Sequence, residues 1–248
     1  MVAEAGPEIK PRPVEEFLNR ALWRPLAHLL VRLLRPLPLR PEALVLLHGV
    51  LGLAAVVLLA RGADALAAAL LLTVIVLDNA DGQLARARGQ VSLLGRYLDS
   101  EVDLVVHAAL FYALYLRSGD ALAAVFAFAV MTAVLSLDFN LGELAAGRAS
   151  AAEPAPRPGS EAWLAAVYRL VFGWQDRLVR RVERGLGPPP EAVLSVLANL
   201  GRGTQLTVLA VYALLGRPEA FLRFQEITFF YVLVVYTVRI WHATRSPR

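Results

Sequence analysis

The sequence predicts an all-α integral membrane protein with six transmembrane helices and an amphipathic interfacial helix at its N-terminus. Hydrophobic residues make up 57% of the 248 residues and charged residues only 19%, and the mean hydropathy is +0.54. Soluble domains carry about a quarter charged residues, so this composition is typical of a chain that lies in a bilayer. The apolar content also excludes a disordered chain, and the absence of cysteine excludes a disulfide scaffold and a Cys-ligated metal site.

Six apolar segments are each expected to form a spanning helix, which needs about 20 largely apolar residues. They cover residues 43–60, 63–77, 92–116, 121–137, 191–215 and 220–241. His48 alone interrupts the first segment, and the second stops at Asp78. We therefore divide the chain into a cytoplasmic N-terminal segment, residues 1–41, and a transmembrane domain, residues 42–248, which includes a cytoplasmic loop and interfacial helix at about 147–190.

Two segments are expected to lie on the cytoplasmic membrane surface rather than to cross it, because their apolar residues recur at helical spacing among arginines. In residues 14–34 the broad apolar face consists of Phe17, Leu18, Leu22, Leu26, Leu29, Leu30 and Leu33. In residues 163–178 it consists of Trp163, Val167, Leu170, Val171, Trp174 and Leu178. Residues 149–159, rich in Ala and Pro, are expected to form a loop, and the polar first 13 residues predict no signal peptide.

The distribution of basic residues sets the expected orientation. With the N-terminus in the cytoplasm, 20 of the 25 lysines and arginines fall on the cytoplasmic side and four on the outer side, while Arg202 lies within a helix. We therefore expect a multi-pass protein of the cell (inner) membrane, with both termini and the active site facing the cytoplasm. Topology and contact with anionic headgroups explain the net charge of +4 and the pI near 9.7, so nucleic acid is not an expected partner.

Four aspartates stand at the cytoplasmic ends of two expected helices. Asp78 and Asp81 are three residues apart, and Asp99 and Asp103 are four apart, so each pair shares one helix face. An aspartate at the centre of a membrane helix costs roughly 2.5–3.5 kcal/mol of insertion free energy. Four aspartates together would therefore be too costly to be incidental. Helix caps or solvated helix ends are the alternative interpretation, but the shared faces favour one pocket of opposed carboxylates.

Such a pocket is expected to bind cations, because unpaired carboxylates so close together cannot all stay ionised. Oxygen ligation, with no Cys or His in the pattern, selects a hard cation such as Mg²⁺ or Mn²⁺. Four carboxylates suit two ions that clamp a phosphate or pyrophosphate, and Arg86 is placed to hold further phosphate charge. The pattern predicts group transfer at phosphorus beside the cytoplasmic membrane surface.

The same residues resemble the signature of the CDP-alcohol phosphotransferases, also called CDP-alcohol phosphatidyltransferases, a family of integral membrane enzymes of phospholipid synthesis. The signature reads D-x2-D-G-x2-A-R-x8-G-x3-D-x3-D, and this chain fills every fixed position with every gap correct. The matching residues are Asp78, Asp81, Gly82, Ala85, Arg86, Gly95, Asp99 and Asp103. The six-helix layout is also similar to the family. One departure is the start of the first spanning helix, where members often carry Pro-Asn-x-x-Thr and this chain reads Pro-Glu-Ala-Leu-Val at residues 41–45.

The resemblance implies a reaction, a cofactor and partners. Members transfer a substituted phosphate from a CDP-linked donor, such as CDP-diacylglycerol, to the hydroxyl of a polar alcohol and release CMP. Two divalent ions, Mg²⁺ or Mn²⁺, would be held by Asp78, Asp81, Asp99 and Asp103, and Asp103 would also act as the general base. The donor would contact Asp78, Gly82, Ala85, Arg86 and Gly95. The implied partners are a CDP-linked lipid donor, a small polar alcohol acceptor, membrane lipid and a second copy of the chain in a homodimer.

The signature does not identify the acceptor alcohol. Arg202 is the best candidate for an acceptor contact, because an arginine within a helix needs an anionic partner and its flanking glycines would leave room for a ligand. Arg148 is the second candidate. If both bind phosphate, the acceptor is a phosphorylated polyol such as inositol phosphate or glycerol 3-phosphate. The alternative is that Arg202 forms a structural ion pair with Asp138 or Glu226. His48 carries no pattern that assigns it a role.

Two rival classes of protein also gather aspartates in a membrane. Intramembrane prenyltransferases hold pyrophosphate through two separated Asp-rich motifs in a larger helical bundle, whereas this chain has one continuous motif. A cation transporter would use the carboxylates as its transport site, but such proteins often show repeats and place polar groups near the bilayer midplane. We see no internal repeat here, and the aspartates lie at helix ends.

Overall fold

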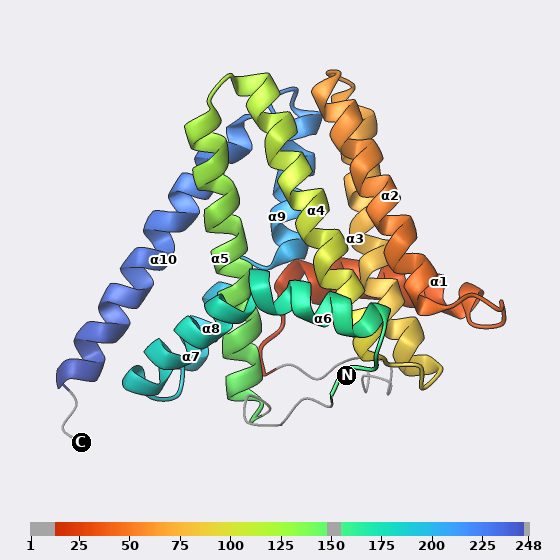
Figure 1. Ribbon diagram of the computed structural model, residues 1–248. Helices are drawn as coiled ribbons and strands as arrows, with labels where there is room; N and C mark the ends of the chain where they lie inside the picture. The colour runs from red at the N-terminus through yellow and green to blue at the C-terminus, as the bar shows by residue number, and fades with distance from the viewer. Residues whose placement is uncertain (1–12, 148–154, 246–248) are drawn as a thin grey trace.

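The computed structural model describes residues 13–147 and 155–245, and within these ranges the chain is helical throughout, with no strand (Figure 1). A short π-helical segment opens the described chain and ten α-helices follow. The elements are η1 (Asn19–Trp23), α1 (Arg24–Leu34), α2 (Pro41–Ala60), α3 (Asp64–Ala87), α4 (Leu93–Ser118), α5 (Ala121–Ala145), α6 (Ser160–Val171), α7 (Gly173–Leu186), α8 (Glu191–Ala198), α9 (Arg202–Leu214) and α10 (Ala220–Arg245).

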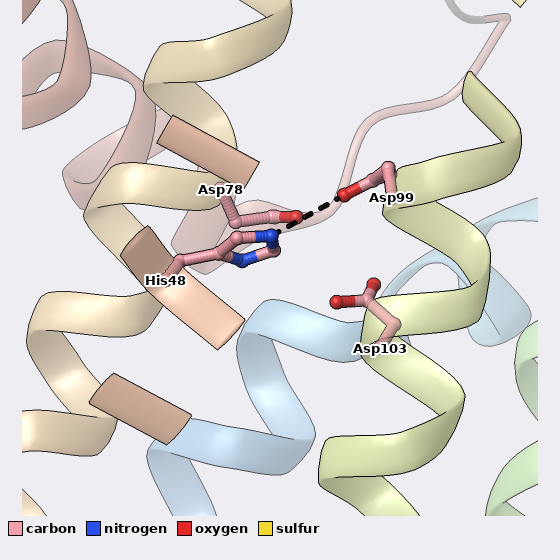
Figure 2. A group of neighbouring side chains, drawn as sticks. All are labelled: His48, Asp78, Asp99 and Asp103. Atoms are coloured by element: carbon pink, nitrogen blue, oxygen red, sulfur yellow. Dashed lines mark ion pairs between the residues drawn. The ribbon is translucent and has the colours of Figure 1, made fainter. Parts of the chain in front are cut away.

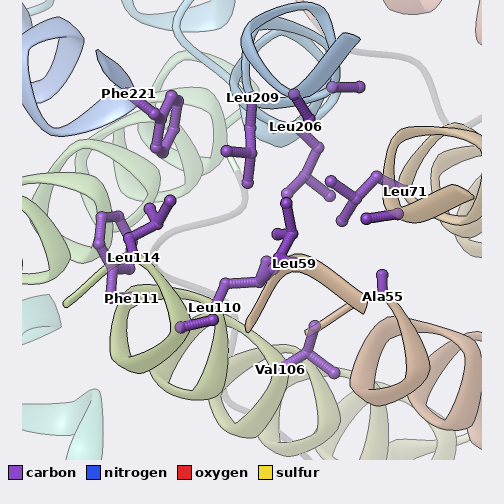
Figure 3. Packing of buried hydrophobic residues seen from close by; sticks show 14 of the residues in the cluster. Ala55, Leu59, Leu71, Val106, Leu110, Phe111, Leu114, Leu206, Leu209 and Phe221 are labelled. Atoms are coloured by element: carbon purple, nitrogen blue, oxygen red, sulfur yellow. The ribbon is translucent and has the colours of Figure 1, made fainter. Parts of the chain in front are cut away.

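The long helices stand side by side, and the shorter helices α1, α6, α7 and α8 lie near one end of this bundle (Figure 1). Helix α3 packs against both α2 and α9, and α2 also packs against α4. The main apolar core lies among these four helices, α5 and the start of α10 (Figure 3). Its largest fully buried members include Leu59 of α2, Leu71 of α3, Leu110 of α4, Leu206 of α9 and Phe221 of α10. Packing in this core fixes the relative positions of α2, α3, α4 and α9, which carry the site residues described below.

Four helices are long and apolar enough to cross a membrane: α2, α3, α5 and α10. They correspond to four of the six expected spans. Helix α4 has 26 residues but carries the second half of the acidic motif, and it falls outside this group. The remaining span, expected as one helix over residues 191–215, is divided into α8 and α9 by a break at residues 199–201. The prediction of a continuous helix there is wrong, and the membrane crossing of α4 and α9 stays a prediction.

The N-terminal segment forms η1 and α1, and its apolar residues occupy two faces rather than one. Trp23, Ala27 and Val31 are buried, with α1 lying against α3. The residues that remain exposed belong to the face expected to meet lipid: Phe17, Leu22, Leu26, Leu29 and Leu33. A helix that is buried on one side and apolar on the exposed side fits the membrane interface. Its location at the bilayer surface remains a prediction.

The second expected interfacial helix is also divided. Helix α6 ends at Val171 and α7 begins at Gly173, so the apolar pattern continues across two helices. Trp163 and Leu170 of α6 and Trp174 and Leu178 of α7 are all exposed. Helix α6 packs against α4, while α7 packs against α5 and α10. The break at Phe172 thus lets one amphipathic sequence pack against α4 on one side and against α5 and α10 on the other.

Candidate metal centre

The fold brings the two halves of the acidic motif together. Asp78 comes from α3, Asp99 and Asp103 come from α4, and the imidazole of His48 joins them from α2 (Figure 2). One ligand atom from each of these four residues lies within 4.8 Å of the other three. We call this set the acidic centre. It contains three of the four predicted metal ligands and one residue that the sequence pattern did not mark.

A close approach of α2 to α4 explains how His48 reaches the aspartates. Gly49 and Gly52 face α4, and a Cβ added at these positions would lie 2.5 Å from Cγ1 of Val102 and 2.7 Å from Cγ1 of Val106, respectively. Because real side chains do not pack at such distances, only glycine permits this helix separation. The contact sets the neighbouring His48 at the level of the aspartates on α4, with its Nε2 3.7 Å from Oδ1 of Asp99.

Arg202, in the first turn of α9, supplies a positive charge to the acidic centre. Its Nη1 donates a hydrogen bond to Oδ1 of Asp78, and its Nη2 lies 2.7 Å from Oδ1 of Asp103. Arg202 thus pairs with two aspartates of the motif, and Glu226 instead pairs with Arg223 at 2.9 Å. One guanidinium faces three carboxylates, so the centre keeps an excess of negative charge.

The sequence suggested that the glycines beside Arg202 would leave room for a ligand. Both glycines line the cavity described below, but the space directly against them is occupied. The carboxylate of Glu16 fills that space: a Cβ added at Gly201 or Gly203 would lie 2.9 Å or 3.0 Å from a Glu16 oxygen. Glu16 is buried and accepts a hydrogen bond from the backbone N–H of Thr204. A carboxylate at a helix N-terminus satisfies free N–H groups and meets the positive end of the helix dipole. Glu16 therefore caps α9 and fixes the direction in which Arg202 leaves the helix.

The donor atoms of the acidic centre fit a divalent cation. Among the described residues, Oδ1 of Asp99 and both ring nitrogens of His48 are buried without a hydrogen-bond partner. Buried polar groups are normally hydrogen-bonded, and several orphaned donors and acceptors facing one point indicate a ligand. The carboxylate oxygens form a ligand set that Mg²⁺ or Mn²⁺ accepts, and His48 adds one imidazole nitrogen beside them.

Asp81 lies outside the acidic centre, although it belongs to the same helix as Asp78. It is buried on α3, and its Oδ2 has no hydrogen-bond partner among the described residues. Asp78 of this pair thus joins the aspartates of α4 in the acidic centre. Asp81 stands one turn further along α3, where the charges of Asp78, Asp99 and Asp103 still act on it, and its binding of a metal ion stays a prediction.

A cavity of about 300 Å³ adjoins the acidic centre. Asp78, Asp99, Asp103 and Arg202 form part of its wall, together with His107. Other polar residues that line it are Glu16, Asn19, Asn79, Arg96, Ser100, Thr132, Ser136, Asp138, Tyr168 and Asp176. Leu104, Leu135, Phe139 and Phe172 complete the wall, so the cavity presents hydroxyl, carboxylate and guanidinium groups among apolar side chains.

The predicted donor-binding residues other than Asp78 do not line this cavity. Gly82, Ala85 and Arg86 lie beyond Asp81 on α3, and a Cβ added at Gly82 would lie 3.3 Å from Nη1 of Arg86. Gly95 lies in the first turn of α4, where its N–H donates to the capping Oγ of Ser92 at 3.0 Å. These residues lie on the last turns of α3 and the first turn of α4. Their contact with a donor stays a prediction, and Arg148 lies outside the described residues.

Two residues of the site carried different signals in the sequence. His48 is the one polar interruption of an apolar run, and in the structure it is 1% exposed. A buried histidine in a membrane helix is a functional hypothesis by default, so this signal was available. Glu16 gave no comparable signal, because it stands among other charged residues in a polar segment and meets Gly203 only through tertiary contact.

The profile of the CDP-alcohol phosphatidyltransferase family matches residues 39–177, which is more than half of the chain. The chain belongs to this family. Its members are transferases of substituted phosphate groups and membrane enzymes. The matched residues include the whole acidic centre, whereas Arg202 and Glu16 lie outside them. Neither a curated protein nor a solved structure matches the chain.

Proposed function

We propose that this chain transfers a substituted phosphate, in particular a phosphatidyl group, from a CDP-alcohol such as CDP-diacylglycerol to a hydroxyl of a polar alcohol, releasing CMP. The observation that carries the proposal is the convergence of Asp78, Asp99 and Asp103 within 4.8 Å beside a cavity whose wall combines polar and apolar side chains. Family membership supports the reaction class. The geometry adds a place where a pyrophosphate and a hydroxyl group would meet.

Two divalent ions, Mg²⁺ or Mn²⁺, complete the proposed site. Asp78, Asp99 and Asp103 would hold the first, and Asp81 would join Asp78 around the second. When bound, the ions would neutralise the donor pyrophosphate and favour departure of CMP. Gly82, Ala85, Arg86 and Gly95 are proposed to contact the cytidine end of the donor, on the last turns of α3 and the first turn of α4.

Asp103 is the proposed general base. Its carboxylate lines the cavity and would take the proton of the acceptor hydroxyl as the oxygen attacks the β-phosphorus. A new P–O bond to the acceptor forms, the pyrophosphate P–O bond breaks, and CMP leaves with its electron pair. A positioned base of this kind contributes typically about 10²- to 10⁴-fold to the rate.

Arg202 and Arg148 are the proposed contacts for an acceptor phosphate. Arg202 is partly exposed to the cavity and lies 2.7 Å from the carboxylate of Asp103. A phosphate held by Arg202 would therefore bring a nearby hydroxyl of the same molecule to the base. This arrangement supports a phosphorylated polyol, such as inositol phosphate or glycerol 3-phosphate, as the acceptor.

The proposal includes a membrane arrangement. The acidic centre would face the cytoplasm in the cell (inner) membrane, with both termini on the same side, residues 1–41 as the cytoplasmic segment and residues 42–248 as the transmembrane domain. The exposed apolar faces of α1, α6 and α7 support contact with lipid at that surface. A homodimer is part of the same proposal.

The test is CMP release by the purified protein in nanodiscs with CDP-diacylglycerol and Mg²⁺ or Mn²⁺. Inositol phosphate, glycerol 3-phosphate, inositol and serine would be added one at a time. We expect release with one acceptor, and a loss of at least about 100-fold in Asp103→Asn with donor binding retained. The control is Glu101→Gln, which removes a carboxylate from the same helix outside the acidic centre. Equal turnover in Asp103→Asn and wild type would refute the base assignment.

A further inference from the structure

We propose that His48 is a ligand of the divalent cation held by Asp78, Asp99 and Asp103, and that this nitrogen ligand makes the centre prefer Mn²⁺ to Mg²⁺. The inference rests on the proposed metal site and adds a ligand and a metal preference to it. The family signature consists of residues on α3 and α4 only, so His48 on α2 is a feature of this chain beyond the signature.

The position of His48 suits direct ligation. Its Nε2 lies 3.7 Å from Oδ1 of Asp99, and the imidazole is directed toward the carboxylates of Asp78 and Asp99 (Figure 2). Two ligand atoms at about 2.1 Å from one ion stand about 3 Å apart at right angles and about 4.2 Å apart on opposite sides. The His48–Asp99 separation falls within this interval, so both side chains can bind one ion with little movement.

The environment of His48 leaves its imidazole without another role. The side chain is 1% exposed, and neither ring nitrogen has a hydrogen-bond partner among the described residues. Gly49, next to His48, lets α2 lie so close to Val102 of α4 that an added Cβ would lie 2.5 Å from the valine. The imidazole is therefore held beside the carboxylates, and a cation there would satisfy the nitrogen that faces them.

A nitrogen ligand changes which ion binds best. Mg²⁺ is bound almost entirely by oxygen and keeps a strict octahedral geometry, whereas imidazole is a good ligand for the divalent transition metals. With three carboxylates alone, the centre would suit both ions. With His48 added, Mn²⁺ gains a favourable bond that Mg²⁺ does not, and the ratio of their affinities shifts toward Mn²⁺.

The experiment uses the full chain in detergent with Mn²⁺ as the probe, and no substrate. Pulsed electron paramagnetic resonance detects the magnetic coupling of a directly bound imidazole nitrogen to Mn²⁺. We expect this coupling in wild type, and we expect its pattern to change when all histidines carry ¹⁵N. The isotope comparison needs no substitution and so does not depend on a variant that folds.

Two matched variants assign the nitrogen. His48→Asn is expected to abolish the coupling and to lower the ratio of Mn²⁺ to Mg²⁺ affinity, measured by titration calorimetry, by at least about 10-fold. The affinity for Mn²⁺ itself should fall by about 10- to 100-fold, since loss of even an outer-shell partner of a metal ligand has this effect, and the ratio falls because Mg²⁺ gains little from the imidazole. His107→Asn removes the other buried histidine that lies near Asp103 but outside the acidic centre, and the coupling should persist.

The outcomes separate this inference from the proposed function. Mn²⁺ bound without nitrogen coupling, or coupling lost in His107→Asn and kept in His48→Asn, would overturn the role of His48 and leave the carboxylate site in place. Failure of wild type to bind Mn²⁺ at all would overturn both. Coupling that depends on His48 would support the ligand even if no CMP were released with any acceptor tested.

Discussion

Replacing Gly49 by alanine is expected to force α2 away from α4 and to weaken the acidic centre. The added Cβ would lie 2.5 Å from Cγ1 of Val102, about 1 Å closer than the 3.4 Å at which ordinary contact begins. Val102 has little freedom to turn aside, because a valine in a helix keeps one preferred rotamer. The clash must therefore be relieved by separation of the two helices, which moves His48 away from Asp99.

The size of the effect follows from two opposing contributions. Overpacking a well-filled contact costs typically about 1–3 kcal/mol, and this clash is severe enough for the upper part of that range. Alanine gains about 1 kcal/mol over glycine in helix propensity. The net loss of unfolding free energy is therefore about 1–2 kcal/mol, which lowers Tm by roughly 2–8 °C for a chain of this length.

The assay is thermal unfolding in detergent, followed by tryptophan fluorescence, with three matched proteins. Gly142→Ala in α5 is the control for propensity, because nothing lies within 4 Å of a Cβ added there, and it should leave Tm unchanged or raise it. Gly49→Ala combined with Val102→Ala should recover stability, because the clashing methyl is removed. Equal Tm values for Gly49→Ala and Gly142→Ala, or no recovery in the double variant, would refute the close-approach argument.

Two further predictions concern α9. Arg202→Gln should lower kcat/KM for the acceptor by about 10- to 100-fold, since a charged hydrogen bond contributes about 1.5–3 kcal/mol. Arg202→Lys should recover only part of this loss of kcat/KM, because lysine cannot make the bidentate contacts of a guanidinium. Unchanged kinetics in Arg202→Gln would contradict a role beside Asp103. Glu16→Gln should destabilise the protein by about 0.5–2 kcal/mol through loss of the α9 cap, and this loss is measured as a lower Tm. Glu15→Gln is the control: it alters a partly exposed ion pair with Arg24 and should lower Tm less. Equal shifts in these two variants would argue against the cap.

The sequence allowed the helices to be predicted better than their ends. Hydropathy identified the apolar part of α3 but stopped at Asp78, whereas the helix continues to Ala87 with the acidic motif on its last turns. Hydropathy measures how apolar a segment is, and a helix does not end where it becomes polar. The break between α8 and α9 could not be seen in the same way, because Glu16, nearly 190 residues away in the chain, provides the cap at which α9 begins.

The candidate site could be predicted only as far as it depends on residues that are close together in the sequence. The spacing within each pair, Asp78 with Asp81 and Asp99 with Asp103, is a local property, and helical periodicity is enough to show that each pair shares a face. Which aspartates of the two pairs meet depends on how α3 and α4 are each turned against α2, with which both of them pack. The partners of Arg202 depend on the position of α9 in the same way.

By itself, therefore, the sequence determined the all-helical class, the acidic motif and the family. These follow from composition and short-range spacing, which do not require the chain to be folded. The tertiary structure alone decided that His48 joins the aspartates, that Arg202 pairs with Asp78 and Asp103, and that Glu16 caps α9. Each of these contacts depends on helix positions that are set to within a few ångströms, such as the close approach that Gly49 allows. Such positions are fixed only when side chains from distant parts of the chain pack together.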